Sequence, residues 1–231
     1  MGNLYIVATP IGNLQDITLR AIEILKKVEY VACEDTRKTG FLLKSLQINT
    51  NPFLISFFEQ NEIKRIPNII NLLENGKDVA LVSDSGTPTI SDPGYKLVRE
   101  TIKIGVKVIS IPGPSAVISA LVSSGLPTDK FLFPGFLPKK SGHRTKLLEN
   151  VKKSNELVNA SIIIFESPFR VVKTLEEILK VFGNINASVS RELTKVYEEI
   201  VRGSVEDLIK HFSSKKLKGE FVIVLNTKPN S

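Results

Sequence analysis

Loops rich in carboxylates, hydroxyls, glycine and proline follow several short apolar segments of the sequence. In the longest of these loops, residues 82–94 read Val-Ser-Asp-Ser-Gly-Thr-Pro-Thr-Ile-Ser-Asp-Pro-Gly, directly after the apolar run 79–82. This composition exceeds what a plain strand-to-helix connection needs. Since open α/β sheets bind ligands at the carboxyl ends of their strands, the loop predicts a ligand site, with an elaborate surface turn as the alternative.

Two further loops in the first half occupy the same kind of position. Residues 9–16 follow the apolar segment 3–8 and contain Pro10 and Gly12, which break the strand and let the backbone approach a ligand. Residues 112–116 precede a helical pattern that Ser115 could cap, so this loop fits either a polar ligand or a capped helix alone. Loop 9–16 has neither the three glycines of a dinucleotide fingerprint nor the Gly-Lys-Ser/Thr of a Walker loop.

Two clusters of charged residues could handle a proton or a phosphate. Residues 34–39, Glu-Asp-Thr-Arg-Lys-Thr, follow the apolar run 30–33, and they fit a helix cap at Asp35 or Thr36, contact with a substrate, or both. Residues 191–195, Arg-Glu-Leu-Thr-Lys, join two expected strands in the second half.

Alternating strand and helix patterns predict an α/β fold with mostly parallel or mixed sheets. A length of 231 residues predicts two domains, which we place at residues 1–116 and 117–231, with a linker-like cluster at 125–129. The expected strands are 3–8, 30–33, 53–57, 79–82, 106–111, 130–133, 160–165, 187–191, 194–203 and 220–226. The expected helices begin at Thr18 and span 36–46, 62–75, 92–104, 115–124, 169–182 and 205–211.

The composition excludes several classes of protein. A hydrophobic content of 42% and a charged content of 24% are those of a globular protein, and no run approaches the roughly 20 apolar residues of a membrane span. The first residues have no signal-peptide pattern, so a cytoplasmic protein is expected. One cysteine and two histidines exclude an internal disulfide and disfavour a structural zinc site; Cys33 is expected in the core.

The net charge of +7 belongs to the second half of the chain. Residues 1–129 carry 13 Lys/Arg and 13 Asp/Glu, whereas residues 130–231 carry 18 and 11. Residues 134–144 are expected to form a flexible basic loop, in which Lys and Arg beside Phe suit single-stranded RNA, and a second basic segment spans 215–219. Solvated lysines without a nucleic-acid partner are the alternative.

Seven loops, taken in order, resemble one family along nearly the whole chain. The family is that of the bacterial 16S ribosomal RNA cytidine 2′-O-methyltransferases, within the tetrapyrrole-methylase superfamily. The resemblance implies two α/β domains with S-adenosylmethionine in the cleft between them, a homodimer, and 16S rRNA or the small ribosomal subunit as partner. The matching loops are residues 9–16, 34–39, 83–94, 112–116, 135–138, 166–170 and 191–195.

The same resemblance assigns roles to individual residues. Phe165 and Leu193 would close over the adenosine of the cofactor, and Ser115 and Ala116 would hold its amino-acid end. The first loop has one glycine, which departs from the Gly-rich pattern of the superfamily. The full set of implied cofactor contacts is Pro10, Gly12, Asp84, Gly86, Ile90, Ser115, Ala116, Phe165 and Leu193.

Methyl transfer to a ribose hydroxyl needs an in-line alignment and removal of the hydroxyl proton. We expect the reacting centre at two groups of residues, which are Glu34, Asp35 and Arg37 in the first half and Glu192 and Lys195 in the second. The base would be a carboxylate or a lysine with a depressed pKa, Arg37 or Arg191 would fix a phosphate, and no metal is required. Asp92, which precedes Pro93, is expected to cap the following helix.

Two other functions compete with this one. A tetrapyrrole-precursor methylase of the same superfamily would share the fold and the cofactor but methylate a different acceptor. A non-catalytic RNA-binding protein would account for the charge and leave the three loops of the first half unexplained. Binding of S-adenosylmethionine separates the two methylases from the binding protein.

Overall fold

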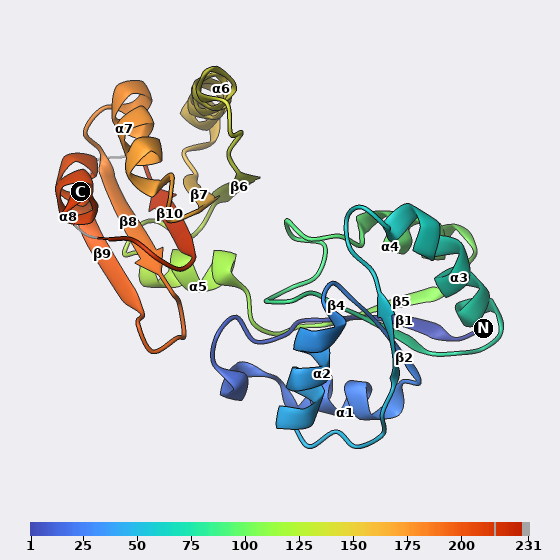
Figure 1. Cartoon of the computed structure of the whole chain (residues 1–231). Helices are drawn as coiled ribbons and strands as arrows, with labels where there is room; N and C mark the ends of the chain where they lie inside the picture. Colours follow the sequence, from blue (N-terminus) through green and yellow to red (C-terminus); the bar gives the residue numbers. More distant parts are fainter. Residues whose placement is uncertain (215, 228–231) are drawn as a thin grey trace. The chain divides into compact units, whose positions relative to one another are not determined.

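The structure is a computed structural model that describes residues 1–214 and 216–227 of the chain. Lys215, in the second basic segment, therefore lies outside the described residues. The chain divides into two compact units, Met1–Ser115 and Ala116–Ser231, and each contains one five-stranded sheet (Figure 1).

The sheet of the first unit is entirely parallel and has the strand order β3-β2-β4-β1-β5. The strand β1 lies between β4 and β5, so that Leu4 pairs with Val79 on one side and with Val108 on the other. Parallel strands need helical crossovers, which confirms the α/β class predicted from the alternation. The strands are β1 (Asn3–Val7), β2 (Tyr30–Cys33), β3 (Phe53–Ser56), β4 (Val79–Val82) and β5 (Lys107–Ile111).

Helices cover both faces of this sheet (Figure 1). A short 3-10 helix (Leu14–Asp16) precedes α1 (Leu19–Lys27), which packs with α2 (Thr36–Ser45) on one core. The helices α3 (Glu62–Glu74) and α4 (Tyr95–Lys103) pack on the other core. Cys33 is fully buried, as predicted, and burial raises the pKa of its thiol to about 11.

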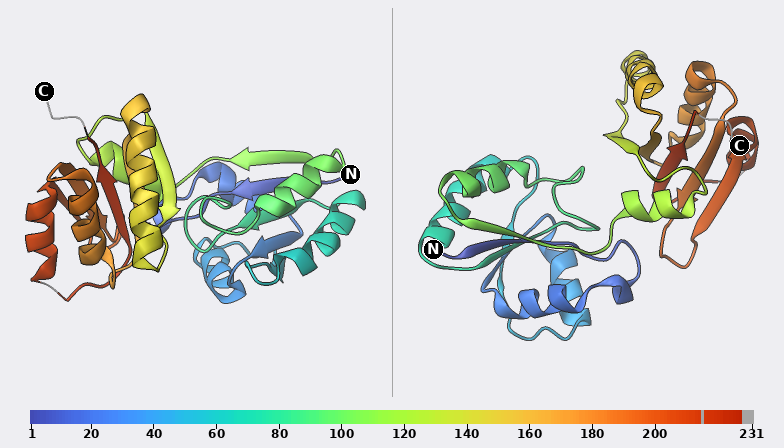
Figure 2. Two further views of the ribbon diagram at one scale, coloured as in Figure 1. Left: turned by 90° about the horizontal axis from the view of Figure 1, so that it is seen from above. Right: turned by 180° about the vertical axis from the view of Figure 1, so that it is seen from behind.

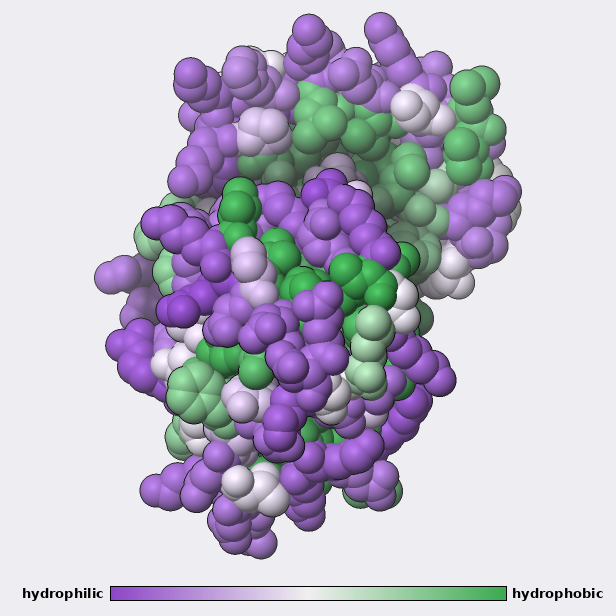
Figure 3. Space-filling model, turned by 90° about the vertical axis from the view of Figure 1, so that its right-hand side faces the viewer, coloured by the Kyte–Doolittle hydropathy of each residue, from purple (hydrophilic) through white to green (hydrophobic). Residues whose placement is uncertain are grey.

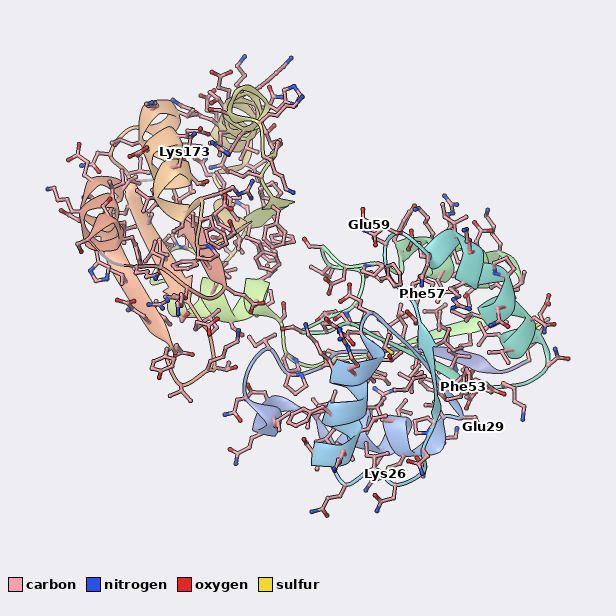
Figure 4. The ribbon with its side chains drawn as sticks, in the orientation of Figure 1. Lys26, Glu29, Phe53, Phe57, Glu59 and Lys173 are labelled. Carbon is pink, nitrogen blue, oxygen red and sulfur yellow. The ribbon has the colours of Figure 1, made fainter. Side chains whose placement is uncertain are left out.

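The edge strand β3 begins at the surface and leads into the core. Phe57 directly follows the strand and is fully buried, whereas Phe53 at its start is 66% exposed and packs edge-on against Tyr30 (Figure 4). Residues 53, 55 and 57 lie on one face of an alternating strand, so the exposure of Phe53 follows from its place at the start of β3 and not from its face.

The sheet of the second unit is mixed and has the order β6-β7-β10-β8-β9. Only β6 and β7 are parallel; the other pairs are antiparallel. Three helices, α6 (Ser141–Val158), α7 (Val171–Phe182) and α8 (Val205–Ser213), share one core, while α5 (Ala116–Ser123) lies on the other face (Figure 2). The strands are β6 (Phe131–Phe136), β7 (Ser161–Glu166), β8 (Asn186–Arg191), β9 (Glu199–Ser204) and β10 (Phe221–Leu225).

Two expected boundaries in this unit are wrong, and helix α6 was not predicted. Residues 194–198 form turns, and the strand predicted from 194 begins at Glu199. The predicted flexible loop 134–144 is reduced to residues 137–140, because β6 extends to Phe136 and α6 begins at Ser141. Phe136 continues the strand since it pairs in register with Phe165 and packs edge-on against its ring at 5.4 Å.

The surface is mixed in polarity. On the face drawn in Figure 3, hydrophilic side chains are the most abundant, and apolar side chains gather in patches between them. Among the described residues, no helix is both long enough and apolar enough to span a bilayer.

Candidate functional site

The three loops predicted in the first half meet at one edge of the first sheet. The backbone of Thr9 exchanges two hydrogen bonds with Gly86, of 2.9 and 3.0 Å. The hydroxyl of Thr87 donates to the carbonyl of Pro114 at 3.1 Å. The loops after β1, β4 and β5 are therefore tied together at the strands' carboxyl ends, where open sheets bind ligands.

Glycines allow these loops to approach one another closely. Gly86 has a φ of +86°, and a Cβ there would lie 3.3 Å from the side chain of Ile11. A Cβ on Gly113 would lie 3.1 Å from that of Ala8. Of the other predicted cofactor contacts here, Gly12 is exposed and Pro10 is half-buried.

Asp84 joins the loop after β4 to the loop after β2. Its carboxylate accepts the backbone N–H of Asp35 at 3.1 Å and Lys38 Nζ at 2.7 Å. Its own backbone N–H donates to the carboxylate of Glu34 at 3.0 Å. Burial, with the nearby charge of Asp84, raises the pKa of Glu34. The sequence placed Lys38 in the cluster 34–39 without a role of its own, and because its partner Asp84 lies 46 residues further on, no local spacing indicated this contact.

The expectation that Asp92 caps the next helix is wrong. Helix α4 begins at Tyr95, and its N-cap is Gly94, with no side-chain cap bond. Asp92 instead lies half-buried in the loop, where burial and the charges of Glu34 and Asp84 raise its pKa to about 7, against a hydrogen bond with Ser83.

The backbone of this loop is unusual beside Asp92. Thr89 and Ser91 have φ values of 74° and 64°, a region that non-glycine residues rarely adopt. Ile90 between them is 45% exposed, which leaves the predicted cofactor contact accessible. Such conformations persist where the surroundings enforce them, and they concentrate at functional sites.

Asp35 caps α2 and also holds Arg37. Its carboxylate accepts the backbone N–H of Arg37 at 2.9 Å, Nε at 3.0 Å and Nη2 at 2.7 Å. The Arg37 side chain holds the pKa of Asp35 well below its usual range, so this carboxylate is a weak proton acceptor. The Arg37 side chain is 89% exposed and remains accessible to a phosphate.

In the second unit, Glu192 and Lys195 form a network with Glu220. Lys195 Nζ lies 2.9 Å from Glu192 Oε1 and 2.8 Å from Glu220 Oε2. Burial acts to lower the pKa of Lys195, but the hydrogen bonds to Glu220 and Glu192 raise it overall. The predicted option of a lysine base with a depressed pKa is therefore wrong, and Lys195 is a cation at neutral pH.

The turn that carries Glu192 is strained and closely packed. Glu192 and Thr194 have φ values of 51° and 65°, and a Cβ on Gly219 would overlap the Glu192 side chain. Leu193 between them is only 9% exposed, which leaves little of its side chain for a cofactor. Arg191 Nε donates to the carbonyl of Lys218 at 2.8 Å.

Phe165 is half-buried at the β6 edge of the second sheet, with its ring centroid 4.8 Å from that of Phe133. Ser115 is the last residue of the first unit and Ala116 begins α5. Among the residues that the structure describes, no group of three His, Cys, Asp or Glu side chains could hold a metal ion.

Comparisons with known proteins agree on one family. The family model for tetrapyrrole (corrin/porphyrin) methylases matches residues 3–209. A protein of Thermotoga maritima is 48% identical over 99% of this chain and 100% of its own length. Proteins of Hydrogenobaculum sp. and Halalkalibacterium halodurans are 48% and 46% identical over 96% and 97% of this chain, and over 95% and 75% of their own lengths. All three carry the name ribosomal RNA small subunit methyltransferase I.

Proposed function

The chain belongs to the tetrapyrrole (corrin/porphyrin) methylase family, and we propose that it methylates the 2′-hydroxyl of a cytidine ribose in 16S rRNA with S-adenosylmethionine as donor. The observation that carries the RNA assignment is the shared name of three relatives that are 46–48% identical over at least 96% of this chain. We also place the reaction in the cytoplasm, and we expect a homodimer from the resemblance alone.

The edge of the first sheet has the chemistry to hold this donor. Three carboxylates, Glu34, Asp84 and Asp92, gather there, and they suit a ligand with a cationic centre, an amine and hydroxyls. Gly86, where a Cβ would lie 3.3 Å from the Ile11 side chain, lets the loops after β1 and β4 pack closely and so fixes the backbone that would face the donor. When bound, S-adenosylmethionine supplies an electrophilic methyl group.

Asp84, Gly86 and Ile90 are the first-unit residues that we assign to the donor, with Ser115 at the end of that unit. Ala116, Pro10 and Gly12 stay predictions from the resemblance, as do Phe165 and Leu193.

The four residues predicted to be catalytic are two cations and the two carboxylates that accept hydrogen bonds from them. Arg37 and Lys195 are both protonated at neutral pH, so each is suited to bind a phosphate or an oxygen that gains negative charge. Asp35 and Glu192 accept hydrogen bonds from these two cations and fix their direction. We therefore assign Asp35 and Glu192 to positioning.

The experiment that tests this function is methylation of 16S rRNA from cells that lack the gene. Purified protein, labelled S-adenosylmethionine and either naked rRNA or small subunits are incubated, and the modified nucleotide is mapped by mass spectrometry. The expected product is a cytidine with a 2′-O-methyl ribose. The same assay with tetrapyrrole precursors tests the first alternative: label in those compounds and not in RNA would replace the RNA proposal. Absence of donor binding would leave only a binding protein.

A further inference from the structure

The link between β6 and α6, residues 137–140, is held from inside the second unit by Arg144. The Arg144 side chain is only 2% exposed, and its Nε and Nη2 each lie 2.5 Å from an oxygen of Glu177. Its remaining Nη1 donates to the carbonyls of Pro138 and Lys139, at 3.4 and 3.3 Å. The residue expected to contact RNA through a flexible loop is thus turned inward.

A second arginine holds the start of the same link. Arg170 Nε donates to Glu166 at 2.8 Å, and the Glu166 side chain is fully buried. Arg170 Nη1 donates to the carbonyl of Leu137 at 3.1 Å. Three consecutive carbonyls, those of Leu137, Pro138 and Lys139, are therefore bound by arginines whose charges are compensated by buried glutamates.

Buried ion pairs are weak devices for stability alone. Removing two charges from water offsets most of their attraction, and apolar side chains of similar volume often stabilise as well or better. Both ion pairs donate to carbonyls of one short link. We therefore attribute to them the fixing of the conformation of residues 137–140.

The outward face of this link is basic and aromatic. Lys139, Lys140 and His143 are exposed, and Phe136 just before them is 56% exposed. Residues 130–148 contain no aspartate or glutamate. The inward arginines are already neutralised by Glu177 and Glu166, so the outward lysines give this surface its positive charge.

We propose that Phe136, Lys139, Lys140 and His143 form a preformed surface that binds single-stranded RNA, with Arg144 and Arg170 as positioning residues. This proposal rests on the proposed function and names the part of the chain that contacts its polymer substrate. Single-stranded RNA presents phosphates to the lysines and an unstacked base to the phenylalanine ring. An acidic protein would use the lysines but would have no base to stack on Phe136.

The first test removes the outward charges. In Lys139→Ala/Lys140→Ala, the affinity for a labelled oligoribonucleotide of about 12 nucleotides should fall about tenfold at low salt, measured by fluorescence anisotropy. The slope of log affinity against log salt should decrease by about 0.7 for each lysine lost. Affinity for S-adenosylmethionine should not change.

The matched control is Lys153→Ala/Lys180→Ala, which removes two exposed lysines elsewhere on α6 and α7. Lys153 lies about 20 Å further along the helix than Lys140, given the rise of an α-helix. If both double variants lost RNA affinity equally, the loss would follow from the lower net charge alone, and the proposed RNA-binding surface would be wrong.

The second test separates positioning from stability. Arg144→Met/Glu177→Leu replaces the buried pair by apolar residues, so the melting temperature should hold or rise while RNA affinity falls about as far as in the lysine variant. Arg144→Lys keeps the charge but loses the planar set of guanidinium donors that reaches both Glu177 and the link. It should therefore also weaken RNA binding. Full RNA affinity in both folded variants would contradict the positioning role.

The outcomes also separate this surface from the proposed function. If the lysine variant methylates 16S rRNA with an unchanged KM, the proposed RNA-binding surface is refuted and the proposed function stands. If RNA binding depends on these residues but the unaltered protein transfers no methyl group, the proposed function is refuted and the RNA-binding surface stands. Binding of polyglutamate that depends on both lysines and competes equally with the RNA would replace RNA by an acidic protein partner.

Discussion

Two regions of the molecule place their charges in opposite ways. At the carboxyl edge of the first sheet, the half-buried groups are acids, Glu34 and Asp92, and Asp84 fastens one loop to the next. At the link 137–140 of the second unit, the buried cation is Arg144, and the exposed groups are lysines.

The difference indicates what each region can bind. Carboxyl groups that are partly removed from water favour a ligand with positive charge or hydrogen-bond donors. Lysines held outward by a fixed backbone favour a polyanion, and the net charge of +7 lies wholly within residues 130–231. We therefore assign the small-molecule donor to the first edge and the polymer to the second region.

The largest effect is expected for Asp84→Asn, which tests whether the edge of the first sheet binds the donor. The amide removes the charge that meets Lys38 and weakens the bond from the Asp35 backbone, so the affinity for S-adenosylmethionine should fall on the order of 100-fold. Titration calorimetry measures this change, and RNA affinity should be unaltered. An unchanged donor affinity would show that the first edge is not the donor site.

Asp78→Asn is the matched control, because Asp78 precedes β4 whereas Asp84 follows it. Asp78 accepts the backbone N–H of Asn3 at 2.8 Å and pairs with Lys27 at 3.2 Å. Its loss should lower the free energy of unfolding by about 1 kcal/mol and leave donor affinity intact, because it lies at the amino end of the strands.

Local patterns predicted most strands and helices, because each pattern lies within one segment of the chain, but they missed α6. The alternation of apolar runs and amphipathic segments placed the strands of the first sheet. The helix expected to begin at Thr18 has that residue as its N-cap, and of the two caps proposed for the next helix, Asp35 is the one observed. The register of β6 against β7 was not local: Phe136 is held in the strand by Phe165, which lies in another segment of the chain.

The sequence showed which charged residues lie in the site regions, but it did not predict what each of them contacts. Arg144 sits within a basic run that looks solvated, and only Glu177, 33 residues further on, makes it a buried group. Asp92 precedes a proline as many capping residues do, but burial and the charge of Glu34, which follows another strand, set its environment, and the following helix has Gly94 as its N-cap. Contacts between distant segments thus decided both cases.

A smaller effect is expected from Asp92→Asn and concerns stability against pH. The pKa of Asp92 is about 7 in the folded protein against an ordinary 3.8, so the folded state binds the extra proton between these values. The free energy of unfolding should therefore fall as pH rises from about 4 to about 7, by on the order of 1 to 2 kcal/mol because water reaches part of this carboxyl. Asn has no proton to lose and should remove that decrease.

Thermal unfolding at about pH 4, 5.5 and 7 measures the difference between the two proteins. They should agree at the lowest pH, and the variant should be the more stable at the highest. Asp129→Asn, at an exposed carboxyl of the second unit, should leave the profile unchanged. A parallel profile for unaltered protein and Asp92→Asn would place Asp92 in solvent and remove it from the acidic edge.

The smallest effect on stability is expected for Arg37→Lys, which tests whether the first unit also touches the polymer. Arg37 is 89% exposed, so the free energy of unfolding should change by less than about 0.5 kcal/mol. A lysine cannot bind a phosphate through two parallel hydrogen bonds, so KM for 16S rRNA should rise several-fold while kcat holds. Arg20→Lys, at an exposed position of α1, is the control and should alter neither constant. A fall in kcat at constant KM would instead place Arg37 at the reacting oxygen, and polymer contact would then belong to the second unit alone.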